Sequence, residues 1–306
     1  MLGVLEGFAA LAVLIALGSL LAHVGFLTYA SQTMLVRLAF WVASPALLLT
    51  VVADADIAAV FSANLVASAG AVAGALLLYL LLSRLVARRP APESVVAALC
   101  SMYVNAGNLG IPVAAYVLGD AALVAPILLL QLLVLQPLAL AVLDRTTAAD
   151  GIGFARLALR TVRNPLLLGA VVGLVLALTG VQLPTVVRSP VDLLGAIAVP
   201  AMLLAYGVSL RLGPKPGAGS PVTEVALVVG LKLLVQPALA YAVGLAVGLQ
   251  DAALYAVTVL AALPTAQNVF VLASRYGRGV VLARDAIFLS TLGSVPAILV
   301  ITALLA

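Results

Sequence analysis

The sequence predicts an all-α membrane protein built from ten spanning helices in two inverted five-helix repeats. Three observations predict it: an apolar composition, a one-sided distribution of basic residues, and two interrupted apolar runs in corresponding places. Of the 306 residues, 65% are hydrophobic and 8% are charged, and the mean hydropathy is +1.29. Soluble domains carry about 25% charged residues, and a chain of this length cannot bury so much apolar surface in its own core. We therefore expect a polytopic protein embedded in the lipid bilayer, with no role in binding nucleic acid.

The apolar runs define the expected elements, because a spanning helix needs roughly 20 apolar residues. The first run has no preceding Lys or Arg and is too long for a signal peptide, so we expect a spanning helix there. The ten predicted spans are Leu5–Ala22, Leu35–Val52, Ala63–Ser83, Ser94–Leu118, Ala121–Leu143, Asn164–Gly180, Val191–Leu210, Pro221–Gly248, Ala252–Ser274 and Leu282–Leu305.

The basic residues support this count. When the connections are assigned alternately to two sides, 13 of the 15 Lys and Arg residues collect on one side, counting Arg284 among them. Arg188 lies on the other side, and Lys232 lies inside a span. The positive-inside rule then places the basic side in the cytoplasm and both termini outside a cell membrane.

Two spans contain a predicted break. The segment Asn105-Ala-Gly-Asn-Leu-Gly-Ile-Pro112 interrupts the run 94–118, and Pro264-Thr-Ala-Gln-Asn268 interrupts the run 252–274. Proline removes a backbone donor, and glycine and asparagine make an unwound conformation less costly. Freed backbone groups are tolerated within a membrane only when they are buried in protein or line a cavity. We therefore expect two broken helices that cross near the bilayer midplane.

Short matches at similar offsets indicate an internal repeat. Ser44-Pro-Ala-Leu-Leu-Leu49 resembles Val199-Pro-Ala-Met-Leu-Leu204 at an offset of 155 residues, and an offset of 156 brings the two breaks together. Because each half has five spans, the second half would enter from the opposite face. The expected division is residues 1–143, a cytoplasmic linker at 144–163, and residues 164–306.

The crossing has the chemistry of a binding site. Each break exposes positive helix amino ends and negative carboxyl ends, worth roughly half a unit charge each. The positive ends favour an anion such as a carboxylate. Kinks with amides that only cap the backbone would be a purely structural alternative, but two paired breaks favour a site. The expected substrate-binding residues are Asn105, Asn108, Gly110, Pro112, Pro264, Thr265, Gln267 and Asn268.

Lys232 is the basic residue inside a span, so it is a functional candidate. It would contact the carbonyl ends of the broken helices or balance an anionic substrate; snorkelling to the interface is the alternative. Its replacement by Ala should strongly reduce transport. Glu6, Arg188, Asp192 and Glu224 are expected to be solvated charges at span ends, and His23 an interfacial histidine.

Several other residues have less specific expectations. Pro45, Pro200 and Tyr206 are candidates for lining a cavity, although packing is the commoner fate of such a tyrosine. Cys100 is the only cysteine, so it forms no intrachain disulfide and is expected to be buried filler. We predict no metal and no cofactor, because the spans lack a cluster of suitable ligands.

Three segments resemble motifs of the auxin efflux carrier family. They are the Asn-x-x-Asn-x-Gly-x-Pro segment at 105–112, the segment from Pro264 to Asn268 with Phe270, Ala273 and Tyr276, and the segment from Lys232 to Pro237. The resemblance covers the whole chain, without the long central loop of the plant members. It implies a crossover fold shared with bile acid symporters and sodium/proton antiporters, and an elevator-like secondary transporter of organic anions. It also implies a carboxylate held by Asn105, Asn108 and Asn268, and a homodimer formed by a scaffold of spans one, two, six and seven.

Three alternatives remain at this stage. A sodium- or proton-coupled carrier of the same fold is the first, although no Asp or Glu is evident in the middle of a span. An intramembrane enzyme is disfavoured, since no set of catalytic residues is present. A membrane sensor without transport activity is the third.

Overall fold

The computed structural model describes residues 2–54, 62–86, 89–147, 164–214 and 219–305, and helices occupy all ten predicted ranges. In chain order the α-helices and π- or 3₁₀-helical turns (η) are α1 (Leu2–His23), α2 (Tyr29–Leu38), η1 (Ala39–Ala43), α3 (Ser44–Ala53), α5 (Ala63–Val86), α6 (Ala91–Met102), η2 (Ala106–Gly110), α7 (Ile111–Val117), η3 (Ala121–Val124), α8 (Ala125–Leu130), η4 (Gln131–Leu135), α9 (Gln136–Thr147), α11 (Pro165–Thr179), α12 (Thr185–Ala196), α13 (Ala198–Leu212), α14 (Val222–Gly230), η5 (Leu231–Val235), α15 (Gln236–Ala246), α16 (Asp251–Ala261), α17 (Gln267–Tyr276) and α18 (Val280–Leu305). Most of the predicted linker lies outside the described residues.

Six continuous helical segments are long and apolar enough to cross a membrane, and many of their large apolar side chains are exposed. Exposed apolar side chains of this kind suit contact with lipid. The prediction of an all-helical membrane protein is therefore confirmed. The other four predicted spans are not among these segments, so the number of crossings stays a prediction. The six segments are 29–53, 63–85, 122–147, 185–212, 222–246 and 280–305.

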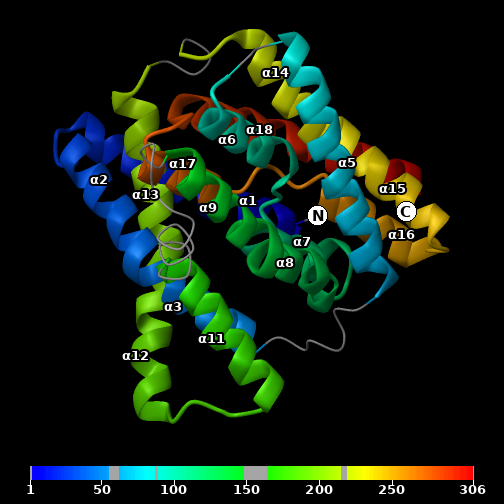
Figure 1. Ribbon diagram of the computed structural model, residues 1–306, viewed down its shortest axis with the longest axis horizontal. Coiled ribbons are helices and arrows are strands. Elements are labelled where there is room, and N and C mark those ends of the chain that lie inside the picture. The colour runs from blue at the N-terminus through cyan, green and yellow to red at the C-terminus, as the bar shows by residue number, and fades with distance from the viewer. Residues whose placement is uncertain (1, 55–61, 87–88, 148–163, 215–218, 306) are drawn as a thin grey trace.

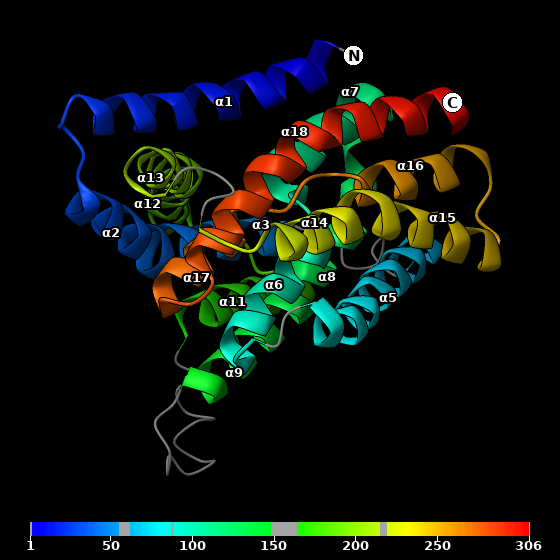
Figure 2. The same ribbon diagram turned by 90° about the horizontal axis from the view of Figure 1, so that it is seen from above.

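The helices gather in two groups, which Figures 1 and 2 show from two directions. In the first group α1 packs along α13, and α11 packs along α3. In the second group α5 packs on α15, and α15 contacts α16. The broken helices α6–α7 and α16–α17 have buried unwound segments at 103–105 and 262–266, and α7 contacts α1 while α17 contacts α13. Most of the buried core surrounds these interior segments.

Glycines allow close approach within the first group. A Cβ atom at Gly18 of α1 would lie 2.4 Å from the carbonyl oxygen of Leu204, and one at Gly173 of α11 would lie 2.6 Å from that of Leu49. Real Cβ atoms essentially never come this close to another heavy atom, so both positions require glycine. Small residues bring helix backbones together in membranes, where dispersion contacts replace the hydrophobic effect.

Prolines explain four of the irregular turns. The π-helical turns η1, η2, η4 and η5 each end two residues before a proline, at Pro45, Pro112, Pro137 and Pro237. A proline ring clashes with the carbonyl group one turn earlier and cannot donate to it. A widened turn before the proline accommodates both effects, and such turns are common at functional sites. Pro112 and Pro237 thus sit in the first turn of the helix that follows.

Candidate functional site

The two broken helices meet through their unwound segments. Tyr103–Asn105 separates α6 from η2, and Ala262–Ala266 separates α16 from α17. The segments pair in antiparallel fashion at Val104 and Thr265. The Asn105 N–H donates to the Pro264 carbonyl at 2.8 Å, and the Ala266 N–H donates to the Tyr103 carbonyl at 3.1 Å. Backbone groups freed by one break are therefore satisfied by the other, as buried backbone requires.

Both breaks begin earlier in the chain than predicted. Gly110 ends the turn η2 and Pro112 lies in the first turn of α7, rather than in an unwound segment. The reason is that proline is compatible with the first helical turn, whose N–H groups lack helical partners anyway. Gly110 has a packing role instead, because a Cβ there would lie 2.7 Å from the Val124 side chain. Likewise Gln267 and Asn268 begin α17.

Three side chains hold the carboxyl ends of the broken helices. The Lys232 Nζ donates to the Ala261 carbonyl at 2.7 Å and to Gln236 Oε1 at 2.6 Å. Gln236 Nε2 in turn donates to the Met102 carbonyl at 2.9 Å, and the Thr265 hydroxyl donates to the Cys100 carbonyl at 2.6 Å. These carbonyls close α16 and α6, where the helix dipole favours donors and cations.

The environment of Lys232 excludes snorkelling, since the residue is 0% exposed. It also does not line the cavity described below. Of the roles expected for it, contact with the helix carboxyl ends is the one its geometry fits. Cys100 is fully buried, as expected.

A network of side-chain amides joins the amino end of η2 to the amino end of α17. Asn105 Nδ2 donates to Gln267 Oε1 at 2.8 Å, and Asn108 Nδ2 donates to the same oxygen at 3.4 Å. The Asn108 N–H approaches Asn105 Oδ1 at 3.4 Å. Buried Gln267 Nε2 has no hydrogen-bond partner among the described residues. The network therefore fixes the amides and keeps donor capacity at the start of α17, where a helix dipole favours an anion.

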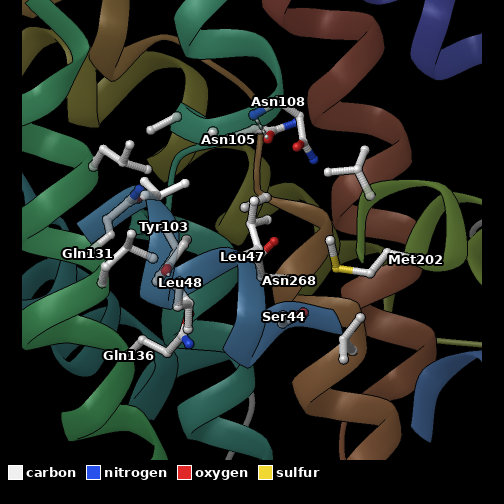
Figure 3. Close-up of a pocket in the computed structure, with 18 of the residues that line it drawn as sticks. Ser44, Leu47, Leu48, Tyr103, Asn105, Asn108, Gln131, Gln136, Met202 and Asn268 are labelled. Atoms are coloured by element: carbon white, nitrogen blue, oxygen red, sulfur yellow. Dashed lines mark hydrogen bonds between the residues drawn. The ribbon is translucent and has the colours of Figure 1, made fainter. Parts of the chain in front are cut away.

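A cavity of about 190 Å³ opens beside the crossing (Figure 3). A single water needs roughly 10–15 Å³, so this space suits a small organic molecule. One part of its wall comes from the crossing and α17, a second from α8, η4 and α9, and a third from α3, α11 and α13. The polar lining consists of Ser44, Tyr103, Asn105, Asn108, Gln131, Gln136 and Asn268, and the remaining lining is apolar or backbone. No Lys, Arg, His, Asp or Glu is among the described residues that line it.

The predicted residues divide into lining and supporting positions. Asn105, Asn108 and Asn268 line the cavity. Gln267 lies behind the asparagines, the Pro264 carbonyl accepts from Asn105, and Thr265 bonds to α6, so these three support the wall without lining it. Figure 3 shows Asn105 and Asn108 together and Asn268 near Leu47 of α3.

The expectation that Pro45, Pro200 and Tyr206 line a cavity is wrong for this one, because their neighbours Ser44, Val199 and Met202 do so instead. The Pro45 carbonyl faces Gly169 of α11. Helical periodicity turns Pro200 away from the face that carries Val199 and Met202. The Tyr206 hydroxyl donates to the Arg284 carbonyl at 2.7 Å, and its ring packs edge-on against Phe270.

Sequence reasoning missed Gln131, Gln136 and Tyr103. The Tyr103 hydroxyl donates to Gln136 Oε1 at 3.1 Å. The two glutamines are polar residues within the apolar run 121–143, and that contrast was a usable signal. It also missed a buried ion pair, in which Arg284 Nε donates to Asp285 Oδ1 at 2.8 Å. Arg284 had been counted as a topological charge, although it is 1% exposed.

The expectation that Glu224 is solvated is also wrong. Glu224 is buried and pairs with Arg89, whose other partner is Glu93. Burial lowers the pKa of the Arg89 guanidinium, but the hydrogen bonds and charges of Glu224 and Glu93 outweigh it and hold that pKa above its usual value. The desolvation cost of burying Glu224 explains why it needs a partner.

Charges at other span ends behave as expected. Arg188 pairs with Asp54 and Asp192 at a partly exposed position. His23 is exposed and Nδ1 accepts from Arg211 at 3.2 Å. The side chain of Glu6 lies outside the described residues.

A multi-pass helical protein with a cavity at crossed, broken helices has the features of a membrane transport protein. The family described as membrane transport protein matches residues 4–147 and 154–302. The chain belongs to this family, the auxin efflux carriers, as the sequence motifs indicated. It is a family of transporters rather than enzymes.

A protein named "Putative malonate transporter" from Rhizobium meliloti (strain 1021) is 27% identical over 214 residues. The match covers 68% of this chain and 66% of that protein, which is slightly less than two thirds of its length.

Proposed function

We propose that this protein is a secondary transporter that carries a small organic anion across the cell membrane by alternating access. The observation that carries the proposal is the cavity at the crossing, where Asn105, Asn108 and Asn268 contribute side-chain amides to the lining. One carboxylate would accept hydrogen bonds from these amides and from the amino end of α17. Malonate is the first substrate to test, given the name of the relative.

The packing of the first helix group supports an inverted repeat with the boundaries 1–143 and 164–306. Gly18 contacts Leu204, and Gly173 contacts Leu49. Gly173 lies 155 residues after Gly18, and Leu49 lies 155 residues before Leu204, so the two contacts are equivalent under the repeat. This is the offset of the matching sequence segments. Two five-helix halves that exchange partners in this way are typical of inverted-repeat transporters.

The position of the cavity between the first group and the crossing supports an elevator-like mechanism. The scaffold would contain α1, α2–α3, α11 and α12–α13 and would form a homodimer. The remaining helices would carry the crossing and the bound anion. Both termini would lie outside the cell, as the basic residues indicate.

The test is uptake of labelled malonate and other small carboxylates into vesicles that contain the purified protein. We expect Asn108→Ala with Asn268→Ala to lower the uptake at least tenfold, because hydrogen bonds to a charged group are worth about 1.5–3 kcal/mol each. Gln182→Ala, at an exposed amide away from the cavity, should leave uptake unchanged.

Intact carboxylate uptake in the double variant would exclude the proposed site. Uptake that requires a sodium or proton gradient would identify the coupled form of the same carrier. If the wild-type protein transports none of a broad panel of anions, the membrane-sensor alternative is favoured instead.

A further inference from the structure

Gln131 is a buried polar residue whose side-chain oxygen lacks a partner in the described part of the chain. It is 1% exposed and lines the cavity from the first position of the π-helical turn η4. Its buried Oε1 has no hydrogen-bond partner among the described residues. Leaving a buried amide unpaired costs about 1–3 kcal/mol, so such a group in a cavity indicates a missing ligand.

Gln131 differs in this respect from Asn105, Asn108 and Gln136, three other amides of the lining. Asn105 and Asn108 bond to Gln267, and Gln136 accepts the Tyr103 hydroxyl. Figure 3 shows Gln131 beside Tyr103, on the side of the cavity opposite Met202. It comes from the fifth predicted span rather than from the crossing, so it forms a second polar position in the cavity.

The electrostatics of the cavity limit what can bind there. No basic side chain is found among the described lining residues, so the amides and the helix amino ends must balance the charge of the substrate. That arrangement can stabilise one carboxylate at the crossing. A second ionised group beside Gln131 would be a buried charge without a counter-charge, which is costly.

A primary amide is complementary to a protonated carboxyl group. The amide oxygen accepts from the carboxyl O–H while the amide N–H donates to the carboxyl C=O, and this forms two parallel hydrogen bonds. An alkyl group would leave both amide atoms unpaired. An amide site therefore distinguishes a carboxylic acid from an alkyl group of similar size.

We propose that Gln131 binds the second, protonated carboxyl group of a short dicarboxylate, so that the transported species is the singly charged hydrogen dicarboxylate. This rests on the proposed function, because it takes the crossing as the site of the first carboxylate. The remaining apolar lining then surrounds the short carbon chain between the two groups.

The test compares malonate with propionate, in which a methyl group replaces one carboxyl group. Uptake of both is measured in vesicles at several pH values, for the wild-type protein, Gln131→Leu and Gln136→Leu. The wild-type protein should prefer malonate at least tenfold at acidic pH. Malonate uptake should fall as the pH rises above the second pKa of malonate, while propionate uptake should change little over the same interval.

Gln131→Leu should lose the preference for malonate and keep propionate uptake within about twofold of the wild type. Gln136→Leu is the matched control, because that amide lines the same cavity but already binds Tyr103. It should affect both substrates alike. Retained preference in Gln131→Leu, an equal loss of both substrates there, or a wild-type preference for the malonate dianion would overturn the proposal.

Failure of the underlying function has a different signature. In that case neither compound is taken up by the wild-type protein, or the Asn108 and Asn268 double variant transports both normally. Retained dependence on those asparagines together with no effect at Gln131 would reject only the second binding position.

Discussion

At the scale of single residues, Lys232 and Gln236 illustrate how buried polar groups stabilise an irregular backbone. They lie one helical turn apart, and together they donate to the last carbonyls of α16 and α6. The two carbonyls, of Ala261 and Met102, belong to buried residues, and the side chains that bind them are almost fully buried as well. These side chains therefore take the place of water as hydrogen-bond donors. One helix therefore fixes the relative positions of two others through a pair of side chains.

Replacement of Lys232 by Ala should reduce transport at least tenfold while the protein remains inserted in the membrane. The change leaves the Ala261 carbonyl and Gln236 Oε1 unpaired, at a cost of about 1–3 kcal/mol for each group. Uptake and thermal stability in detergent are the measurements. Arg278→Ala, at an exposed position, is the control. Unchanged uptake in the Lys232 variant would remove this residue from the mechanism.

The sequence allowed the asparagines of the cavity to be predicted but not the division of labour around them. Asn105, Asn108 and Asn268 are polar residues next to helix breakers within apolar runs, and that contrast is visible without coordinates. Whether a polar residue faces the cavity or supports a neighbour depends on one step of helical rotation. This is why Gln267 and Thr265 were grouped with the lining residues and Gln131 was missed.

At the scale of helices, close glycine contacts connect α1 with α13 and α11 with α3. The Gly18 and Gly173 positions correspond under the proposed repeat, so their substitution should have similar effects. A side chain at either position would have to push the partner backbone away. These contacts depend on backbone proximity, because lipid offers no hydrophobic driving force for helix association.

We expect Gly18→Val and Gly173→Val each to lower the amount of folded protein and its thermal stability by comparable amounts. Overpacking of this kind typically costs about 1–3 kcal/mol, and more where the backbone itself is in the way. Gly230→Val is the control, because a Cβ atom there meets nothing within 4 Å. A large effect at one glycine and none at the other would argue against equivalent packing in the two halves.

The existence of the helices and of both breaks was predictable, since long apolar runs and prolines are strong local signals. The position of each break was less predictable. Proline is tolerated in the first turn of a helix, so Pro112 marks the helix that follows the break rather than the break itself. In contrast, Pro264 lies within the unwound segment, and no local signal distinguishes the two cases.

At the scale of the whole molecule, the cavity lies between the crossing and helices α3, α11 and α13 of the first group, an arrangement that could not be assigned from local sequence. The buried pair Arg284 and Asp285 shows why, because its charges indicate a solvated helix end until the tertiary structure covers them. The hydrogen bond from Tyr206 of α13 to Arg284 of α18 is another contact between the groups.

If the two groups move relative to one another, a covalent tether across the cavity should stop transport. We expect Leu47→Cys with Val271→Cys, in a Cys100→Ala background, to lose uptake when a short reducible thiol cross-linker is added and to regain it after reduction. Both residues line the cavity, from α3 and α17.

The matched control pair is Gly74→Cys with Leu239→Cys, which joins α5 to α15 within one group. A Cβ atom at Gly74 would lie 2.7 Å from the Leu239 side chain, so this pair can also be linked. Cross-linking there should leave uptake intact. Full activity of the first pair after complete cross-linking would contradict movement between the groups.

Trp41 provides an optical consequence of this architecture. It is the only tryptophan of the chain, and the Arg275 guanidinium lies 5.3 Å from the centroid of its ring. Trp41 belongs to η1, whereas Arg275 is near the end of α17, the helix that begins at the crossing. Displacement of α17 would take the cation away from the indole and change its fluorescence. If substrate binding moves α17, we therefore expect the emission of this native fluorophore to change, which can be followed in the unlabelled protein.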